Sequence, residues 1–305
     1  MSSLPPLPYD DWEPTKQTLH LWAQIVGKVK LATSPPKNHW WHVPLYLDVH
    51  GLTTRLLHGA DGRPFEIRFD LVGHRLVVET GQAEDSFALA DGLSVAEFDR
   101  RLHAMLAGLD LDVPIVERPF GVATTTPFPE DTEHHSYDAE AVERFRRVLD
   151  WSGTVLEEFA GWFDGKQSPV HLFWHSFDLA LTRFSGRRAP ELADADPVTR
   201  EAYTHEVVSF GFWAGDDRVR EPAYYSYTAP EPDGLRGRPI APEGRTRWVE
   251  TGGGSLAVLP YDDVRSAADP RATVLEFLES VFEAGADAAG WNRAELRSTW
   301  CPPLP

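Results

Sequence analysis

The sequence predicts an α+β fold with mostly antiparallel strands, arranged in two similar halves. Each half runs from a helical pattern through several strand-like segments to another helical pattern, and the strand–helix alternation of a parallel sheet is missing. After the first helix of each half the order aromatic, Trp, His recurs, as WWH at 40–42 and FWH at 173–175. This echo raises the hypothesis of an internal duplication. The polar, turn-rich stretch GVATTTPFPEDTEHHSYD separates the halves, which we place at 1–120 and 121–305 and expect to pack as one globular unit.

The first half begins with a Pro-rich segment, residues 2–14, which we expect to be an extended arm pinned to the body by Tyr9 and Trp12. Apolar residues at helical spacing predict a helix over 15–32, and SPPKN ends it. The next segments are HWWHVPLYLDVHG, expected as a strand, a hairpin turning at 72–74, a helix over 94–109 with Ser94 as its N-cap, and VPIVERPF, expected as a further strand.

The second half has the same order of elements. A long helix or a kinked pair of helices is predicted over 138–165, and the apolar run over 170–190 predicts one long strand. Three more strands are expected over 204–216, 222–230 and 255–263, and a helix with one apolar face over 272–291.

Charge and cysteine content exclude several classes of function. The net charge is −18, from 29 basic and 47 acidic residues, which argues against nucleic acid and anionic membranes as partners, because phosphates attract Lys and Arg. The one cysteine, Cys301, excludes a disulfide within the chain and a Cys-rich zinc site, and it lacks neighbours that would support a nucleophile. The sequence shows no signal peptide and no apolar run of about 20 residues, so we expect a cytoplasmic protein.

The segment over 170–190 carries most of the candidate catalytic residues. It places His171, His175, Asp178 and Arg183 in an apolar run, and burying such groups is costly unless they are paired. In a regular strand the two histidines lie on one face roughly 13 Å apart, too far to bind one metal ion together. Either imidazole would serve as acid or base if it faced a cavity; the alternative is that both are hydrogen-bonded core or edge histidines. Asp178 and Arg183 face opposite sides, so each needs a partner from another segment.

The end of that segment and the motif NHWWH supply candidate ligand-binding residues. Arg183 and Arg187 flank a Ser-Gly turn and would suit a carboxylate or phosphate; the alternative is ion pairs with the surplus of acidic residues. In NHWWH, Trp41 offers a flat apolar wall and His42 a polar group, unless the segment is simply a strand entering the core.

The segments THEVVSFGFW and YYSY add His205, Trp213 and Tyr224. If His205 faced inward it would converge with the other candidate histidines, and three such ligands suit zinc or non-haem iron. The Tyr224 phenol would donate a hydrogen bond or act as an acid. The loop EDTEHHSYD holds good ligand atoms without a recognised metal spacing, so we expect Asp138 to cap the next helix instead. No phosphate-binding loop, GxSxG or HExxH motif is present, and the sequence identifies no cofactor.

Four segments carry a resemblance to a known family: NHWWHVPLY, DTEHHSYD, HLFWHSFDLALTRFSGRRAP and EAYTHEVVSFGFW. They resemble a bacterial family known as domain of unknown function 5996. The resemblance extends over nearly the whole chain, and its motifs are long enough to be specific. No activity, cofactor or catalytic residue is established for that family, so the resemblance implies none here.

The leading hypothesis is an intracellular protein, either a binding protein or an enzyme, that holds a small, largely apolar or aromatic molecule in a cleft between the halves. Trp41, Trp174 and Trp213 would line this cleft, and His, Asp and Arg from the central strands would supply polar anchors. Two alternatives stay open. One is a zinc or non-haem iron enzyme with His ligands from different strands. The other is an interaction protein that docks a partner on an aromatic surface and therefore exposes Trp174.

Overall fold

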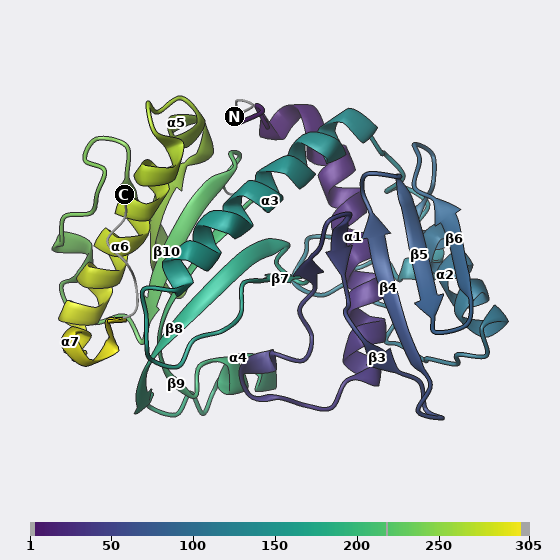
Figure 1. Ribbon diagram of the computed structural model, residues 1–305, viewed down its shortest axis with the longest axis horizontal. Helices are drawn as coiled ribbons and strands as arrows, with labels where there is room; N and C mark the ends of the chain where they lie inside the picture. Colours follow the sequence, from purple (N-terminus) through teal and green to yellow (C-terminus); the bar gives the residue numbers. More distant parts are fainter. Residues whose placement is uncertain (1–3, 218, 300–305) are drawn as a thin grey trace.

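The computed structural model describes residues 4–217 and 219–299, and it has the expected α+β architecture with two six-stranded sheets (Figure 1). All the strand pairs in both sheets are antiparallel. The first half contains helix α1 (Tyr9–Thr33), the 3₁₀ turn η1 (Asn38–Trp40), strands β1 (Tyr46–Leu47), β2 (Gly51–Thr53), β3 (Leu57–His58), β4 (Pro64–Asp70), β5 (Arg75–Thr80) and β6 (Glu84–Ala88), and helix α2 (Val95–Gly108).

The second half repeats the order of a helix, six strands and a helix, with short insertions. It contains η2 (Phe128–Glu130), α3 (Ala139–Ala160), β7 (His171–Phe173), β8 (Asp178–Arg188), α4 (Pro197–Ala202), β9 (His205–Trp213), β10 (Ala223–Ala229), η3 (Leu235–Gly237), β11 (Arg247–Thr251), β12 (Gly254–Pro260), α5 (Tyr261–Arg265), α6 (Pro270–Ala288) and α7 (Arg293–Leu296).

The two sheets are joined through the first strand of each half. Leu45, which precedes β1, and Leu172 of β7 exchange both backbone hydrogen bonds, at 2.9 and 2.8 Å. From this junction the first sheet runs outward in the order β1-β2-β4-β5-β6, with β3 beside β4, and the second in the order β7-β8-β9-β10-β12-β11. Each half therefore begins its sheet at the same place, on the boundary with the other half.

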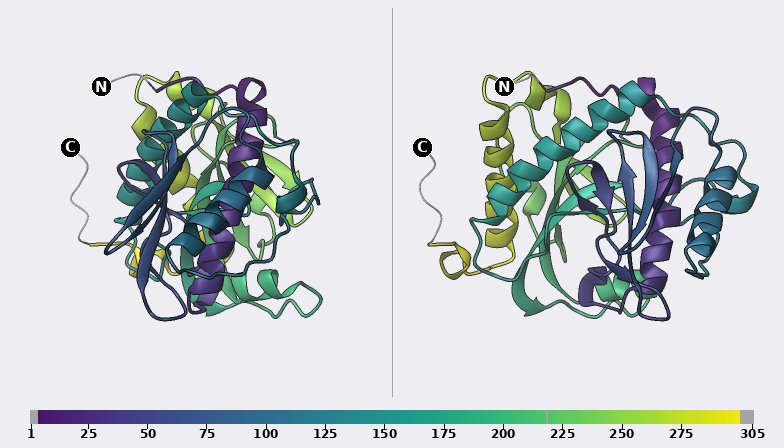
Figure 2. Two further views of the ribbon diagram at one scale, coloured as in Figure 1. Left: turned by 90° about the vertical axis from the view of Figure 1, so that its right-hand side faces the viewer. Right: turned by 45° about the vertical axis from the view of Figure 1, so that its right-hand side comes forward.

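Long helices cover one face of each sheet. Helices α1 and α2 lie behind the first sheet, and α3 and α6 lie in front of the second (Figures 1 and 2). Alternate side chains of a strand point to opposite faces, so one face of the second sheet packs on α3 and α6 while the other is turned toward α1. Among the described helices, none combines the length and apolar character needed to cross a bilayer.

Helix α1 begins earlier than the sequence predicted. Residues 2–14 were expected as an extended arm, but the described part of that segment is extended only over 4–8, and Pro14 lies inside the helix. Tyr9 and Trp12 do pin this end of the chain, with 3% and 1% of their surface exposed. The helix is buried on nearly every side because both halves pack on it, which explains its apolar residues outside a single stripe.

Two segments of the first half that were expected to be strands have a different structure. The segment HWWHVPLYLDVHG begins with the turn η1, where His39 and Trp40 have φ of 56° and 59°, and only short strands follow it. The segment VPIVERPF, residues 113–120, forms no strand. Its two prolines lack the N–H that a sheet ladder requires, although Val113 still packs in the core.

The segment over 170–190 is a hairpin rather than one strand, which corrects the prediction that mattered most for the site. Strand β7 ends at Phe173, residues 174–177 form a tight turn, and β8 starts at Asp178. Phe177 N–H donates to the Phe173 carbonyl at 2.7 Å, and Phe177 has a φ of 57°, which is unusual for a bulky residue. The estimate of 13 Å between His171 and His175 therefore does not apply, because a turn separates them.

The remaining helices and strands follow the predictions closely. The hairpin at 72–74 joins β4 to β5, and the Ser94 hydroxyl accepts from Glu97 N–H at 3.1 Å as the N-cap of α2. The helix predicted over 138–165 is a single helix, α3, capped by Asp138. The predictions missed β3, β6, β11 and the short helices α4, α5 and α7, which are brief or highly polar. The prediction for Cys301 falls outside the described residues.

Candidate functional site

A cleft of about 1090 Å³ lies between the two halves. One wall is formed by α1, η1 and residues 120–124, and the floor is the face of the second sheet that α3 and α6 leave uncovered. Many aromatic residues line the cleft, among them Tyr9, Trp40, Trp41, Phe120, Phe173, Trp174, Phe184, Tyr203, Trp213, Tyr225 and Tyr227. The volume is just above the range of about 300–1,000 Å³ that is usual for sites of small molecules, and apolar walls are typical of such sites.

The floor is built from alternate residues of three neighbouring strands. Strand β8 contributes Asp178, Ala180, Thr182 and Phe184, β9 contributes Val207, Ser209 and Trp213, and β10 contributes Tyr225 and Tyr227. Ala180, Gly211 and Tyr225 lie side by side across the three strands. A Cβ on Gly211 would come within 2.6 Å of the Tyr225 ring. The glycine therefore lets this ring lie flat against the sheet.

Asp178 and Tyr225 form the main polar contact of the floor. The Tyr225 hydroxyl donates to Asp178 Oδ2, and the Ser176 hydroxyl donates to Oδ1 of the same carboxylate. Only 8% of the surface of each of Asp178 and Tyr225 is exposed. Burial raises the pKa of Tyr225 well above its usual value, and the Asp178 charge adds to this effect. Each carboxylate oxygen has more than one acceptor site, so Asp178 can accept a further hydrogen bond from a bound molecule.

A second group of hydroxyls lies beside this pair. The Tyr203 hydroxyl donates to the Tyr227 hydroxyl at 3.1 Å, and Thr182 Oγ1 lies 2.9 Å from Ser209 Oγ. The Tyr225 and Tyr227 rings stack with centroids 6.3 Å apart and planes 7° from parallel. The floor thus combines a flat aromatic surface with several hydrogen-bonding groups.

Helix α1 holds the opposite wall in place through its own buried polar residues. Gln24 Nε2 donates to the Phe120 carbonyl at 2.9 Å, and Gln24 Oε1 accepts from Phe120 N–H at 2.8 Å. His20 Nε2 lies 3.1 Å from the His175 carbonyl. Burial lowers the pKa of His20 to about 3, because it disfavours the charged imidazole. These contacts fix the 120–124 segment and the 174–177 turn against the same helix.

Five of the residues that the sequence singled out line the cleft: Trp41, Trp174, His175, Asp178 and Trp213. Trp174 Nε1 donates to the Val43 carbonyl at 3.1 Å, and its ring lies against Gly27 of α1, where a Cβ would approach it to 2.3 Å. Burial lowers the pKa of His175, and the neighbouring Asp178 charge opposes this shift. A neutral imidazole therefore lies close to the Asp178 carboxylate.

Three others lie away from the cleft. Arg183 points to the covered face, where its guanidinium carbon is 3.6 Å from the Phe159 ring centroid and 4.6 Å from that of Phe282. Tyr224 is fully buried on the same face, with its hydroxyl 2.7 Å from Ser152 Oγ.

Arg187 is exposed and pairs with Glu206 and with carbonyls at the end of α6. The alternative that the sequence left open for Arg187, an ion pair with an acidic residue, is thus the arrangement that the structure shows. Arg183 and Arg187 do not form a joint anion site, because Arg183 is 0% exposed and on the face turned away from the cleft.

The candidate histidines do not converge. His171 is fully buried, and among the described residues neither ring nitrogen has a hydrogen-bond partner. His42 Nδ1 accepts from Lys37 N–H at 3.1 Å, near η1. His205 lies at the start of β9, where Thr204 Oγ1 is 3.0 Å from its Nδ1 and its ring meets the His39 ring edge to face. His175 alone of the four lines the cleft.

The cleft also uses residues that the sequence analysis did not select. Tyr225, Tyr227, Ser209 and Tyr203 each bring a hydroxyl group to its lining. The alternation of β9 and β10 was a usable signal, because Ser209 shares a face with Trp213 and Tyr225 shares one with Tyr227. Tyr203 lies just after α4, and no pattern in the sequence joins it to these strands.

Comparison with known proteins yields a single relation. No curated protein and no solved structure matches the chain. A family model described as a family of unknown function, DUF5996, matches residues 4–298. Because this match spans nearly the whole sequence, the chain belongs to the DUF5996 family.

Proposed function

We propose that this protein binds a small molecule with a flat, largely apolar body and at least one N–H or O–H donor, in the cleft between its two halves. The observation that carries the proposal is the Asp178–Tyr225 pair on the floor of an aromatic-walled cleft. Flat rings pack well on aromatic side chains. A partly satisfied carboxylate in apolar surroundings is a strong and selective acceptor for the donor of such a ligand.

The rest of the cleft supports a ligand that is not strongly anionic. Asp178, Asp196, Asp216 and Asp217 line it, and the whole chain carries a net charge of −18. Lys16 and Lys28 lie on the α1 wall, and burial lowers the pKa of both amines. The same charge supports the proposal that nucleic acid is not a partner.

Catalysis in the same cleft is a further part of this proposal, and His175 is the residue that favours it. An imidazole held neutral near a carboxylate can accept a proton from a bound substrate. Asp178 itself touches the place where the donor of the ligand would lie. A binding protein and an enzyme share this geometry, and turnover of the bound compound would distinguish them.

The two alternative functions fit the structure less well. A metalloenzyme would need ligands from His42, His171, His175 and His205, which lie in separate surroundings. An interaction protein would expose Trp174, which is 5% exposed. Of the eleven tryptophans, Trp300 lies outside the described residues, and each of the others is buried or half-buried.

Titration with indole tests the proposed anchor. Indole is a flat apolar ring with a single N–H donor, and we expect the wild-type protein to bind it saturably, as measured by calorimetry. Asp178→Asn should weaken this binding about tenfold or more, because a hydrogen bond to a charged acceptor contributes about 1.5–3 kcal/mol.

The control ligand is 1-methylindole, which has the same ring without the donor. It should bind wild type and Asp178→Asn with similar affinity. Equal loss of affinity for both compounds would contradict the assigned role of Asp178, and absence of saturable indole binding to the wild type would contradict the aromatic site itself.

A further inference from the structure

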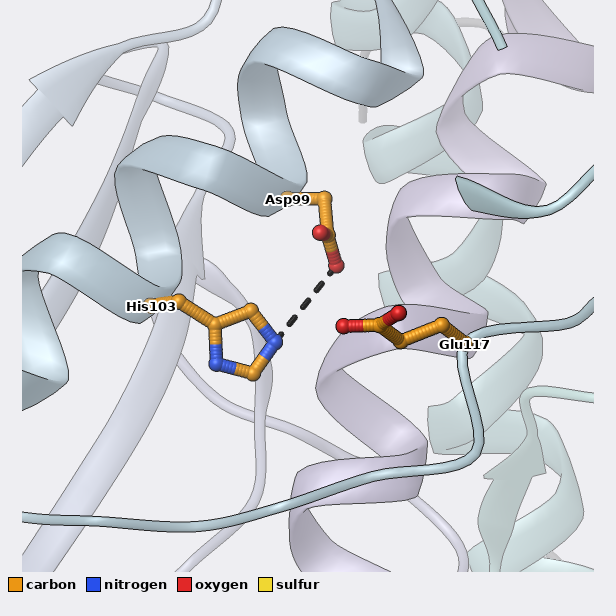
Figure 3. Close-up of side chains that lie close together, drawn as sticks. All are labelled: Asp99, His103 and Glu117. Carbon is orange, nitrogen blue, oxygen red and sulfur yellow. Dashed lines mark ion pairs between the residues drawn. The ribbon is translucent and has the colours of Figure 1, made fainter. Parts of the chain in front are cut away.

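A second cluster of ligand-type side chains lies on α2, away from the residues that line the cleft. Asp99 and His103 are one helical turn apart and therefore share a face of the helix, and Glu117 reaches them from the segment after α2 (Figure 3). One ligand atom from each residue lies within 4.8 Å of the others. Among the residues that the structure describes, this is the one group of three His, Cys, Asp or Glu side chains close enough to share a metal ion.

The buried member of the cluster has a carboxylate oxygen that faces His103 as an ion pair but accepts no hydrogen bond among the described residues. The Asp99 side chain is 6% exposed, and its Oδ1 has no hydrogen-bond partner among the described residues. His103 Nε2, 3.6 Å away, also lacks one. A buried carboxylate oxygen without a hydrogen bond is costly and rare in native proteins. Both unpartnered atoms point into the space that Glu117 closes (Figure 3).

The distances between the three ligand atoms suit an ion of the zinc class if the Glu117 side chain moves slightly. Zinc binds imidazole nitrogen and carboxylate oxygen at about 2.0–2.2 Å in a tetrahedral arrangement, which places neighbouring ligand atoms about 3.3 Å apart. The Asp99–His103 separation of 3.6 Å is already close to that value. Glu117 is exposed, so its side chain can turn inward at little cost.

We propose that Asp99, His103 and Glu117 bind one divalent transition-metal ion of the zinc class, with the fourth position open to water. This metal site does not depend on the proposed function of the cleft. The two sites are nevertheless neighbours in sequence. Glu117 is three residues before Phe120, the start of the 120–124 segment that forms one wall of the cleft. The ion would therefore tie this segment to α2 as Gln24 ties it to α1.

Zinc titration of the untagged, chelator-treated protein tests the site. In competition with a chromophoric zinc chelator, the wild type should bind one zinc ion per chain. Glu117→Gln should weaken binding at least tenfold, because even the loss of an outer hydrogen-bonding partner of a metal ligand costs about 10–100-fold. The exposed Glu117 is the safest ligand to replace, since its variant should fold normally.

The matched control is Asp112→Asn, which removes another exposed carboxylate from the same segment and should bind zinc as the wild type does. At the same zinc concentration, zinc should also raise the melting temperature of wild type and Asp112→Asn more than that of Glu117→Gln. Absence of stoichiometric zinc binding in the wild type, or equal binding by the two variants, would overturn the proposal. Neither outcome decides whether the wild-type protein binds indole, so the two proposals are tested independently.

Discussion

Gly211→Ala should destabilise the protein by about 3 kcal/mol, at the upper end of what overpacking in a well-packed interior usually costs. A Cβ at this position would lie 2.2 Å from the Leu179 carbonyl oxygen and 2.6 Å from the Tyr225 ring. The carbonyl belongs to β8, which is paired with β9 along its length, so it cannot move without disturbing the sheet. Relief through the Tyr225 ring would instead break its hydrogen bond to Asp178.

Urea denaturation of wild type and variant measures the effect. Gly108→Ala is the control, because a Cβ there meets no atom within 4 Å and Gly108 ends α2. That substitution should leave stability unchanged or raise it by up to about 1 kcal/mol. If Gly211→Ala were as stable as Gly108→Ala, that result would contradict the close packing that we describe for β8, β9 and β10 under the cleft.

The stability of the protein should fall steeply as the pH drops from about 6.5 toward 3. Burial lowers the pKa of His20 and of His171 to about 3, well below the ordinary value of about 6.5. Between these values the unfolded chain binds protons that the folded protein excludes. Stability therefore rises with pH in this window, by about 1.4 kcal/mol per pH unit for each histidine.

Carboxyls whose pKa is raised by burial act in the opposite direction over part of the window, and they include Asp99, Asp150 and Glu279. Burial raises the pKa of Asp99 to about 6, so between about pH 6 and its ordinary pKa the folded protein binds a proton that the unfolded chain releases. This offsets one of the two histidines there. The fall in stability should consequently be steepest below about pH 4, where Asp99 is protonated in both states.

Urea denaturation across this pH range measures the slope, and His171→Leu tests its origin. Removing the buried imidazole should reduce the slope of unfolding free energy against pH by the contribution of one titrating group, about 1.4 kcal/mol per pH unit. His58→Leu is the matched control, since His58 is exposed on β3 and the variant should retain the wild-type slope. An unchanged slope in His171→Leu would show that this ring is not held neutral in the folded protein.

The long helices of the fold follow from local sequence patterns, whereas the hairpin at the centre of the site does not. Ser94 and Asp138 are recognisable caps, and the periodic apolar residues of α2 and α3 predict their faces. The turn at 174–177 carries aromatic residues in place of the Gly, Asn or Asp that usually mark one. Its geometry is imposed by packing of Trp174 on Gly27 and of Phe177 on His20 and Phe145.

Only part of the candidate site could be predicted from the sequence. Residues within or close to the aromatic motifs, such as Trp41, His175 and Asp178, do line the cleft. Arg183 and Tyr224 do not, because each lies on the strand face that α3 and α6 cover, and a strand with two apolar faces gives no sign of which face meets the helices. Asp99 and His103 are four residues apart on a predicted helix, and this spacing was a usable signal for two ligands on one helix face. Glu117, from the segment after α2, supplies the third side chain of that group.

The central claim, a ligand site on the floor of the cleft, is tested most directly by filling that floor. Thr182 lies on this floor, on the same face of β8 as Asp178, and is half-buried, so Thr182→Trp fills part of the cleft floor with an indole side chain. Thr154→Trp adds the same side chain at an exposed position on α3. Calorimetric titration with indole should show binding to wild type and Thr154→Trp and at least a tenfold loss in Thr182→Trp. Undiminished binding by a folded Thr182→Trp protein would place the ligand elsewhere and contradict the account.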